Sequence, residues 1–86
     1  MKVWITAYAL TKGILEGNGD IATSSPRMIC MEKSGHFKDT AFPYFRGEGK
    51  DWHRTEESAI KEANRRVAAK ISSLESQLER LRALKF

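Results

Sequence analysis

Residues 2–10, KVWITAYAL, are rich in β-branched and aromatic side chains, and in an extended strand they alternate between two faces. One face carries Val3, Ile5, Ala7 and Ala9, and the other carries Trp4, Thr6, Tyr8 and Leu10. Both faces of this segment carry apolar groups, so we expect a strand that is covered on both sides. A turn at Gly13 and a second, distorted strand near residues 13–22 should follow. The sequence GNGD at residues 17–20 is typical either of a tight turn or of a bulged strand.

Two further strands are predicted before residue 47. Residues 27–32, RMICME, show an alternation that puts Ile29 and Met31 on one face. The lone Cys30 excludes an internal disulfide and should be a buried, inert thiol. Residues 41–46, AFPYFR, are rich in aromatic residues. Because Pro43 cannot donate a ladder hydrogen bond, this fourth strand belongs at a sheet edge or a bulge.

A glycine-rich stretch, GEGKDWHR at residues 47–54, separates these strands from a helical pattern. We expect a loop in which Trp52 anchors the junction to the core. Thr55 is a good N-cap, and the two acids that follow it suit the first turn of a helix. From Glu56 the helical pattern continues almost to the end of the chain without glycine or proline.

These elements predict an α+β fold in a single domain, residues 1–86. A small antiparallel sheet of three to four strands, residues 2–46, occupies the β part (1–54). One long C-terminal helix, about residues 56–84, occupies the rest (55–86). A helix of ~30 residues spans about 45 Å, which is longer than so small a domain needs. Its distal half should therefore project, or pack on a partner.

The helix carries a heptad pattern, in which apolar residues alternate by four and three. This pattern predicts a homodimer with a coiled-coil interface of Val67, Ile71, Leu74, Leu78 and Leu81. In a parallel pair, Lys70 would meet Glu75 of the second chain, and Asn64 at a core position would set the register. An antiparallel pair and docking onto a host protein are the alternatives. The helix face nearer the sheet should cover it with Ala59, Ile60, Ala63 and Val67.

The formal net charge of +4 permits contact with phosphates or acidic proteins. It argues against an acidic mimic of nucleic acid. No apolar run is long enough for a membrane span, and no signal-peptide pattern is present. We therefore expect a cytoplasmic protein without membrane contact.

Candidate catalytic and metal-ligating residues do not form a recognisable motif. The available histidine, cysteine and aspartate residues lack the paired spacing of metal sites, so no metal and no cofactor are predicted. Asp51 and His53 lie two residues apart and would share a face of an extended segment, as a general base requires. No nucleophile is tied to them by sequence, so we predict no catalytic residues and a protein that is not an enzyme.

Basic residues near the helix start are the best local candidates for contact with a ligand or partner. They are Lys50, His53, Arg54, Arg65 and Arg66. GEGK is not a P-loop, because the spacing and the trailing Ser or Thr are missing. Nucleic acid is possible, since aromatic residues on the sheet (Tyr8, Tyr44, Phe45) could stack on bases. The glutamates interleaved with the helix cations are more typical of a solvated helix.

Two stretches, VWITAYALTKGI (3–14) and YFRGEGKDWHRTEESAI (44–60), together with a basic, leucine-bearing helix that ends in ALKF, resemble a group of short uncharacterised phage and prophage proteins. This resemblance implies an accessory protein in the bacterial cytoplasm. Such proteins inhibit a host factor by stoichiometric binding, for example a CRISPR-type antiviral effector. The partner would be a host protein or a protein–nucleic-acid complex. The alternative is binding of nucleic acid, or of a nucleotide or phosphate ligand, by the basic helix and the 47–54 loop.

Overall fold

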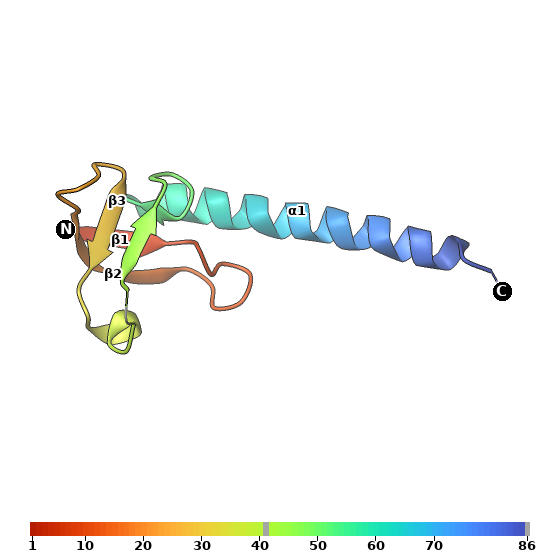
Figure 1. Cartoon of the computed structure of the whole chain (residues 1–86). Helices are drawn as coiled ribbons and strands as arrows, with labels where there is room; N and C mark the ends of the chain where they lie inside the picture. The colour runs from red at the N-terminus through yellow and green to blue at the C-terminus, as the bar shows by residue number, and fades with distance from the viewer. Residues whose placement is uncertain (41, 86) are drawn as a thin grey trace.

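The computed structural model describes residues 1–40 and 42–85 and shows a small head (residues 1–55) that carries one long helix (Figure 1). Its elements are β1 (Lys2–Ile5), β2 (Leu15–Ile21), β3 (Met28–Met31), a 3₁₀ turn (Gly35–Phe37), β4 (Tyr44–Arg46), β5 (Trp52–His53) and α1 (Glu56–Ala83). Over the described residues, the five strands pair antiparallel in the order β4-β3-β2-β1-β5. The predicted α+β fold is confirmed, with one strand more than expected.

The first strand is shorter than its alternation predicted, because tertiary contacts remove the chain from the sheet at Thr6. Val3 and Ile5 are fully buried, and β1 ends there. The backbone N–H of Thr6 donates to the carbonyl of Asp51 at 2.8 Å instead of continuing the ladder with β2. Residues 7–12 then form turns, although their pattern still alternates.

The GNG sequence lies inside β2, so the strand interpretation is confirmed and the tight turn is wrong. The two glycines are required by close packing. A Cβ atom on Gly19 would lie 2.7 Å from the carbonyl oxygen of Cys30, and one on Gly17 would lie 2.9 Å from the methyl carbon of Met31. Glycine therefore lets β3 and the 3₁₀ turn approach this face of the sheet.

The core lies on one face of the sheet and consists of Val3, Ile5, Leu15, Ile29, Met31, Phe37, Phe45 and Trp52. The alternation predicted for β3 is confirmed, although Cys30 is half-buried rather than buried. Phe45 packs edge-to-face on Phe37 with ring centroids 5.8 Å apart. Because Phe45 is only 7% exposed, it cannot stack on nucleic-acid bases as the sequence suggested.

Both sheet edges are short. β4 follows Pro43 and is an edge strand, as expected, while Ala41, where that strand was predicted to begin, lies outside the described residues. The other edge is β5, in a segment predicted as loop, where Trp52 pairs with Ile5 of β1. The prediction of three to four strands missed β5, because two residues are too few to show an alternation.

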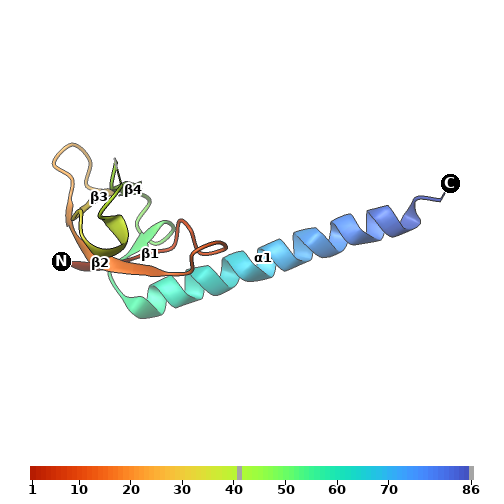
Figure 2. The same cartoon turned by 90° about the horizontal axis from the view of Figure 1, so that it is seen from below.

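α1 begins as predicted: the hydroxyl of Thr55 accepts from the backbone N–H of Ser58 at 3.2 Å. Its first turns pack on the head, where Ala59 is buried and Ala63 half-buried. Ile60 and Val67, predicted to cover the sheet, are each 43% exposed. All described residues beyond Arg66 are exposed, and Figures 1 and 2 show this part of α1 running away from the head.

The molecule is elongated, with extents of 56 × 26 × 23 Å. This shape agrees with the expected projection of the helix. Within the described residues, no helix combines the length and the apolar character that crossing a membrane requires.

Candidate functional site

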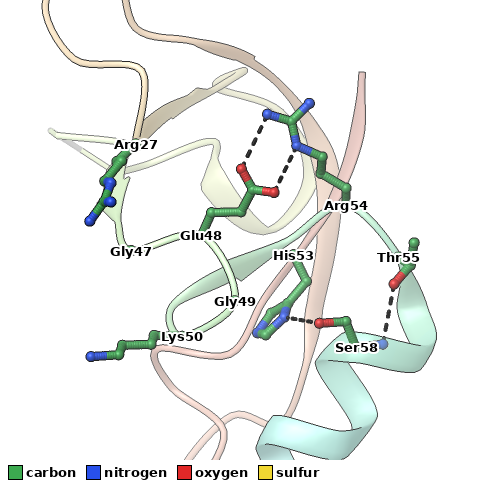
Figure 3. Close-up of a pocket in the computed structure, with 9 residues that line it drawn as sticks. All are labelled: Arg27, Gly47, Glu48, Gly49, Lys50, His53, Arg54, Thr55 and Ser58. Carbon is green, nitrogen blue, oxygen red and sulfur yellow. Dashed lines mark hydrogen bonds and ion pairs between the residues drawn. The ribbon is translucent and has the colours of Figure 1, made fainter.

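A pocket of about 610 Å³ opens where the 47–50 loop and β5 meet the start of α1 (Figure 3). We call it the junction pocket. It is lined by Arg27, Gly47, Glu48, Gly49, Lys50, His53, Arg54, Thr55 and Ser58. Its volume lies within the range of small-molecule sites in proteins. Three of its side chains, Lys50, His53 and Arg54, belong to the basic cluster that the sequence indicated.

Hydrogen bonds between backbone groups of residues 47–52 close the loop of the junction pocket. Gly47 and Gly49 have φ angles of 85° and 86°, which favour glycine. The carbonyl of Gly47 accepts from the N–H groups of Lys50 and Asp51, both at 3.0 Å. The N–H of Gly49 donates to the carbonyl of Trp52 at 2.8 Å. These bonds hold the loop in one shape, so the side chain of Lys50 starts from a defined position.

Arg27 precedes β3 in the chain, and a hydrogen bond to its backbone carbonyl holds it beside the pocket. A buried tryptophan such as Trp52 usually has an acceptor for its indole N–H. Trp52 is fully buried, and its Nε1 donates to the carbonyl of Arg27 at 3.0 Å. The N–H of Gly47 donates to the same carbonyl at 3.2 Å. Sequence reasoning missed Arg27, since nothing local links it to a loop 20 or more residues away. The only available signal was the predicted burial of Trp52.

His53 is buried between two hydroxyl groups. Its Nε2 lies 2.9 Å from Oγ1 of Thr6, and its Nδ1 lies 2.7 Å from Oγ of Ser58. The Thr6 hydroxyl donates to the carbonyl of Lys50, so it accepts from His53 Nε2–H. The lone pair on Nδ1 then accepts from the Ser58 hydroxyl. Burial lowers the pKa of His53 below its usual value, which favours this neutral ring.

Asp51 and His53 do not form the pair that a general base would need. Asp51 instead accepts from Nη2 of Arg66 at 2.9 Å. The side-chain hydrogen-bond partners of His53 are two hydroxyls, and neither Thr6 nor Ser58 was singled out from the sequence. Thr6 is 47 residues away along the chain, and Ser58 was interpreted only as a helix position. No sequence pattern of a histidine between two hydroxyls was available to reveal them.

The cations of the junction pocket differ in their pairing. Arg54 donates from Nε and Nη2 to the two carboxylate oxygens of Glu48, at 3.0 and 3.2 Å. Arg27 and Lys50 have no carboxylate within 4.0 Å among the described residues. In Figure 3 both of these side chains extend on the same side of the loop, while Arg54 folds back onto Glu48. The pocket therefore carries uncompensated positive charge.

The two helix arginines predicted as contacts lie outside the pocket lining. Arg66 donates to the carbonyls of Thr6 and Lys50, at 2.9 and 2.8 Å. These bonds stabilise the backbone of the pocket loop at Lys50 and join it to the end of β1. Arg65 donates to both carboxylate oxygens of Glu62, at 2.7 and 2.8 Å. Hydrogen bonds from Arg65 and then from Arg66 lower the pKa of Glu62 to about 2, although its burial opposes this shift.

A second candidate surface lies on the projecting part of α1. We call it the apolar stripe: Val67, Ile71, Leu74, Leu78 and Leu81. The exposed fraction of these residues runs from 43% at Val67 to 65% at Leu81. They recur at intervals of four and three residues and so share one side of the helix. These are the five residues that the sequence predicts as a dimer interface, and the head does not cover them.

Neither surface resembles a metal centre. No group of three or more metal-ligating side chains comes together within residues 1–40 and 42–85. No known protein family, curated protein or solved structure matches the chain. The resemblance to short phage proteins therefore stays a prediction.

Proposed function

We propose that this chain is a non-enzymatic binding protein that pairs with a second copy through the apolar stripe and holds a host protein with its head. The observation that carries the proposal is the stripe itself. Five branched apolar residues lie exposed along the part of α1 that projects from the head. A contiguous exposed patch of this kind is typical of a protein interface, because water contact with apolar surface is unfavourable.

A second copy fits the apolar stripe because its spacing is that of a coiled-coil seam. The four–three spacing places each stripe residue against its counterpart on a parallel partner. The charges beside the seam are also complementary. In a parallel pair, Lys70 of each chain faces Glu75 of the other, which gives two opposite-charge contacts.

The head remains free in such a dimer, since the stripe begins at Val67, just beyond the last half-buried helix residue, Arg66. Two heads at the same end of a parallel pair present the same surface twice, which strengthens binding to a partner with repeated sites. The partner class implied by the phage resemblance is a host antiviral effector, inhibited by stoichiometric binding in the bacterial cytoplasm.

Sedimentation equilibrium of the full chain tests the pairing. The wild type should have twice the chain mass at tens of micromolar. Leu74→Glu with Leu81→Glu should be monomeric, because four carboxylates would otherwise lie in the seam. The matched control, Ser73→Glu with Ser76→Glu, adds the same charge outside the seam and should remain dimeric. A monomeric wild type would contradict the proposal.

Charge reversal in the same experiment tests the orientation of the pair. Lys70→Glu should weaken a parallel dimer through repulsion with Glu75 of the second chain. Lys70→Glu combined with Glu75→Lys restores opposite charges only in the parallel arrangement. Failure of the double variant to recover the dimer would show that the helices run antiparallel.

Binding of nucleic acid by the basic helix is the alternative, and its support is the net charge of +4. Contacts within the head weaken it. Arg65 and Arg66 are both held by Glu62, and Phe45 is buried. An affinity for DNA or RNA that falls steeply with added salt would nevertheless favour this function over the first.

A further inference from the structure

We infer that the junction pocket binds the phosphate group of a small ligand between Arg27 and Lys50, and that binding is accompanied by proton uptake at His53. This site does not depend on pairing of the helices. Three features of the pocket support it: two unpaired cations, a hydroxyl that can change its donor direction, and a cavity of suitable size.

The cations come from separate parts of the chain and are held by their backbones. The carbonyl of Arg27 accepts from Trp52 and Gly47, and the carbonyl of Lys50 accepts from Thr6 and Arg66. Their side chains have no carboxylate partner among the described residues. A dianion bound between them would receive charge-assisted hydrogen bonds from a guanidinium and an ammonium group.

The hydroxyl of Ser58 is the third group that contacts the phosphate. Whether it can donate to the ligand depends on the protonation state of His53. While the ring is neutral, the Ser58 hydroxyl donates to Nδ1 at 2.7 Å and has no proton left for a ligand. When the ring is protonated, Nδ1–H donates to Oγ instead, and the hydroxyl proton is free to point into the pocket. At Nε2, the Thr6 hydroxyl already accepts, so protonation leaves that bond intact.

The charged groups around His53 determine how easily this proton is taken up. Glu62 and Asp51 favour the protonated ring, and Arg66 opposes it. The pocket itself adds the cations Arg27 and Lys50 and the Arg54–Glu48 pair. A bound dianion offsets the pocket cations and thereby makes the protonated ring more favourable. Ligand and proton should therefore bind cooperatively.

The cavity indicates a small molecule as the source of the phosphate. About 610 Å³ accommodates a phosphate monoester with its organic part. The lining contains no phenylalanine, tyrosine or tryptophan on which a nucleic-acid base could stack. Inorganic phosphate and a phosphate monoester share the same anionic chemistry, so both belong in the test.

The first experiment follows backbone amide signals by NMR at low salt during titration with inorganic phosphate, glycerol phosphate or adenosine monophosphate. Saturable shifts are expected at Gly49, Lys50 and Ser58. Tighter binding of the monoesters would identify an ester as the ligand class, and equal binding would identify free phosphate. Arg27→Gln with Lys50→Gln should weaken binding by about tenfold or more, because two charged hydrogen bonds are lost.

The control for that variant is Lys33→Gln with Lys38→Gln, which removes the same charge from exposed positions outside the pocket. It should bind phosphate as the wild type does. Shifts that do not saturate, or equal weakening in both double variants, would overturn the site, because the effect would then be non-specific charge attraction.

The second experiment measures sulfate affinity from pH 7.5 to 5, because sulfate keeps its charge over this range whereas phosphate does not. The affinity should rise as the pH falls, by at most about tenfold per pH unit, since one proton is taken up. Direct NMR titration of the wild-type His53 ring should show its pKa rising when sulfate is added. A pH-independent affinity with an unmoved pKa would refute the coupling.

Ser58→Ala isolates the hydroxyl. Its sulfate affinity should rise less between pH 7.5 and pH 5 than that of the wild type. A variant that keeps the full pH dependence would show that the hydroxyl does not connect His53 to the ligand.

Discussion

The head and the distal helix (residues 67–83) differ in which side chains they bury and which they expose. In the head, polar groups are buried and paired: among the described residues, every buried side-chain nitrogen or oxygen has a hydrogen-bond partner. Along the distal helix, apolar groups are exposed and unpaired, with Leu81 at 65%. The head satisfies its buried polar groups internally, whereas no other part of the described residues covers the apolar stripe of the distal helix.

This difference shows what each region contributes to a short chain. The head folds around one thin core and keeps its polar network at the junction with α1. A small domain cannot bury a helix of 28 residues along its full length. The remaining helix can therefore serve another molecule, and we propose that this molecule is a second copy.

The largest expected effect is in the head. Trp52→Ala should lower its free energy of unfolding by about 3–5 kcal/mol, because a fully buried indole and its hydrogen bond to Arg27 are lost. Urea unfolding followed by circular dichroism measures this loss. Trp4→Ala, at a half-exposed position, is the control and should cost less. Equal midpoints for the two variants would show that Trp52 does not anchor the head.

Two neighbouring arginines, Arg65 and Arg66, lie at the boundary between the head and the distal helix. Arg66→Met should destabilise the chain by about 2 kcal/mol, since Arg66 joins α1 to two carbonyls and to Asp51. Arg65→Met should cost less than Arg66→Met, because the guanidinium of Arg65 is exposed and pairs with Glu62 inside the helix without reaching the head. Comparable losses in thermal unfolding would mean that Arg66 does not connect helix and head.

A further expected effect depends on pH. The pKa of Glu62 is about 2 in the folded chain, against a usual 4.5, so its charged form stabilises the fold. That contribution is complete above about pH 4.5 and is lost as the pH falls towards 2. Urea midpoints between pH 5 and 2 should therefore decline less steeply in Glu62→Gln than in the wild type.

Glu32→Gln, at an exposed position in the head, serves as the control for this series. Its decline should follow that of the wild type. The interpretation of Glu62 would be wrong if both variants changed the slope equally.

The elements with regular patterns were predictable. The β3 alternation, the Thr55 N-cap and the helix to residue 83 all follow from residue spacing. β5 and the early end of β1 were not, because Trp52 and Thr6 take their conformations from each other's segments. The sequence predicted only part of the junction pocket. Lys50 and His53 lie in one local cluster, but Arg27, which lines the pocket, and Thr6, which contacts His53, come from distant parts of the chain.

The α+β class, the start of the helix and the apolar stripe can be predicted from the amino-acid sequence alone, because each depends on residue spacing within one segment. The folded structure is needed to see that Arg66 contacts the pocket loop while Arg65 does not, and that His53 lies between Thr6 and Ser58. Adjacent residues on a helix point in different directions, and which direction meets the head depends on how α1 docks. Contacts of that kind join residues far apart in the chain, so no local pattern encodes them.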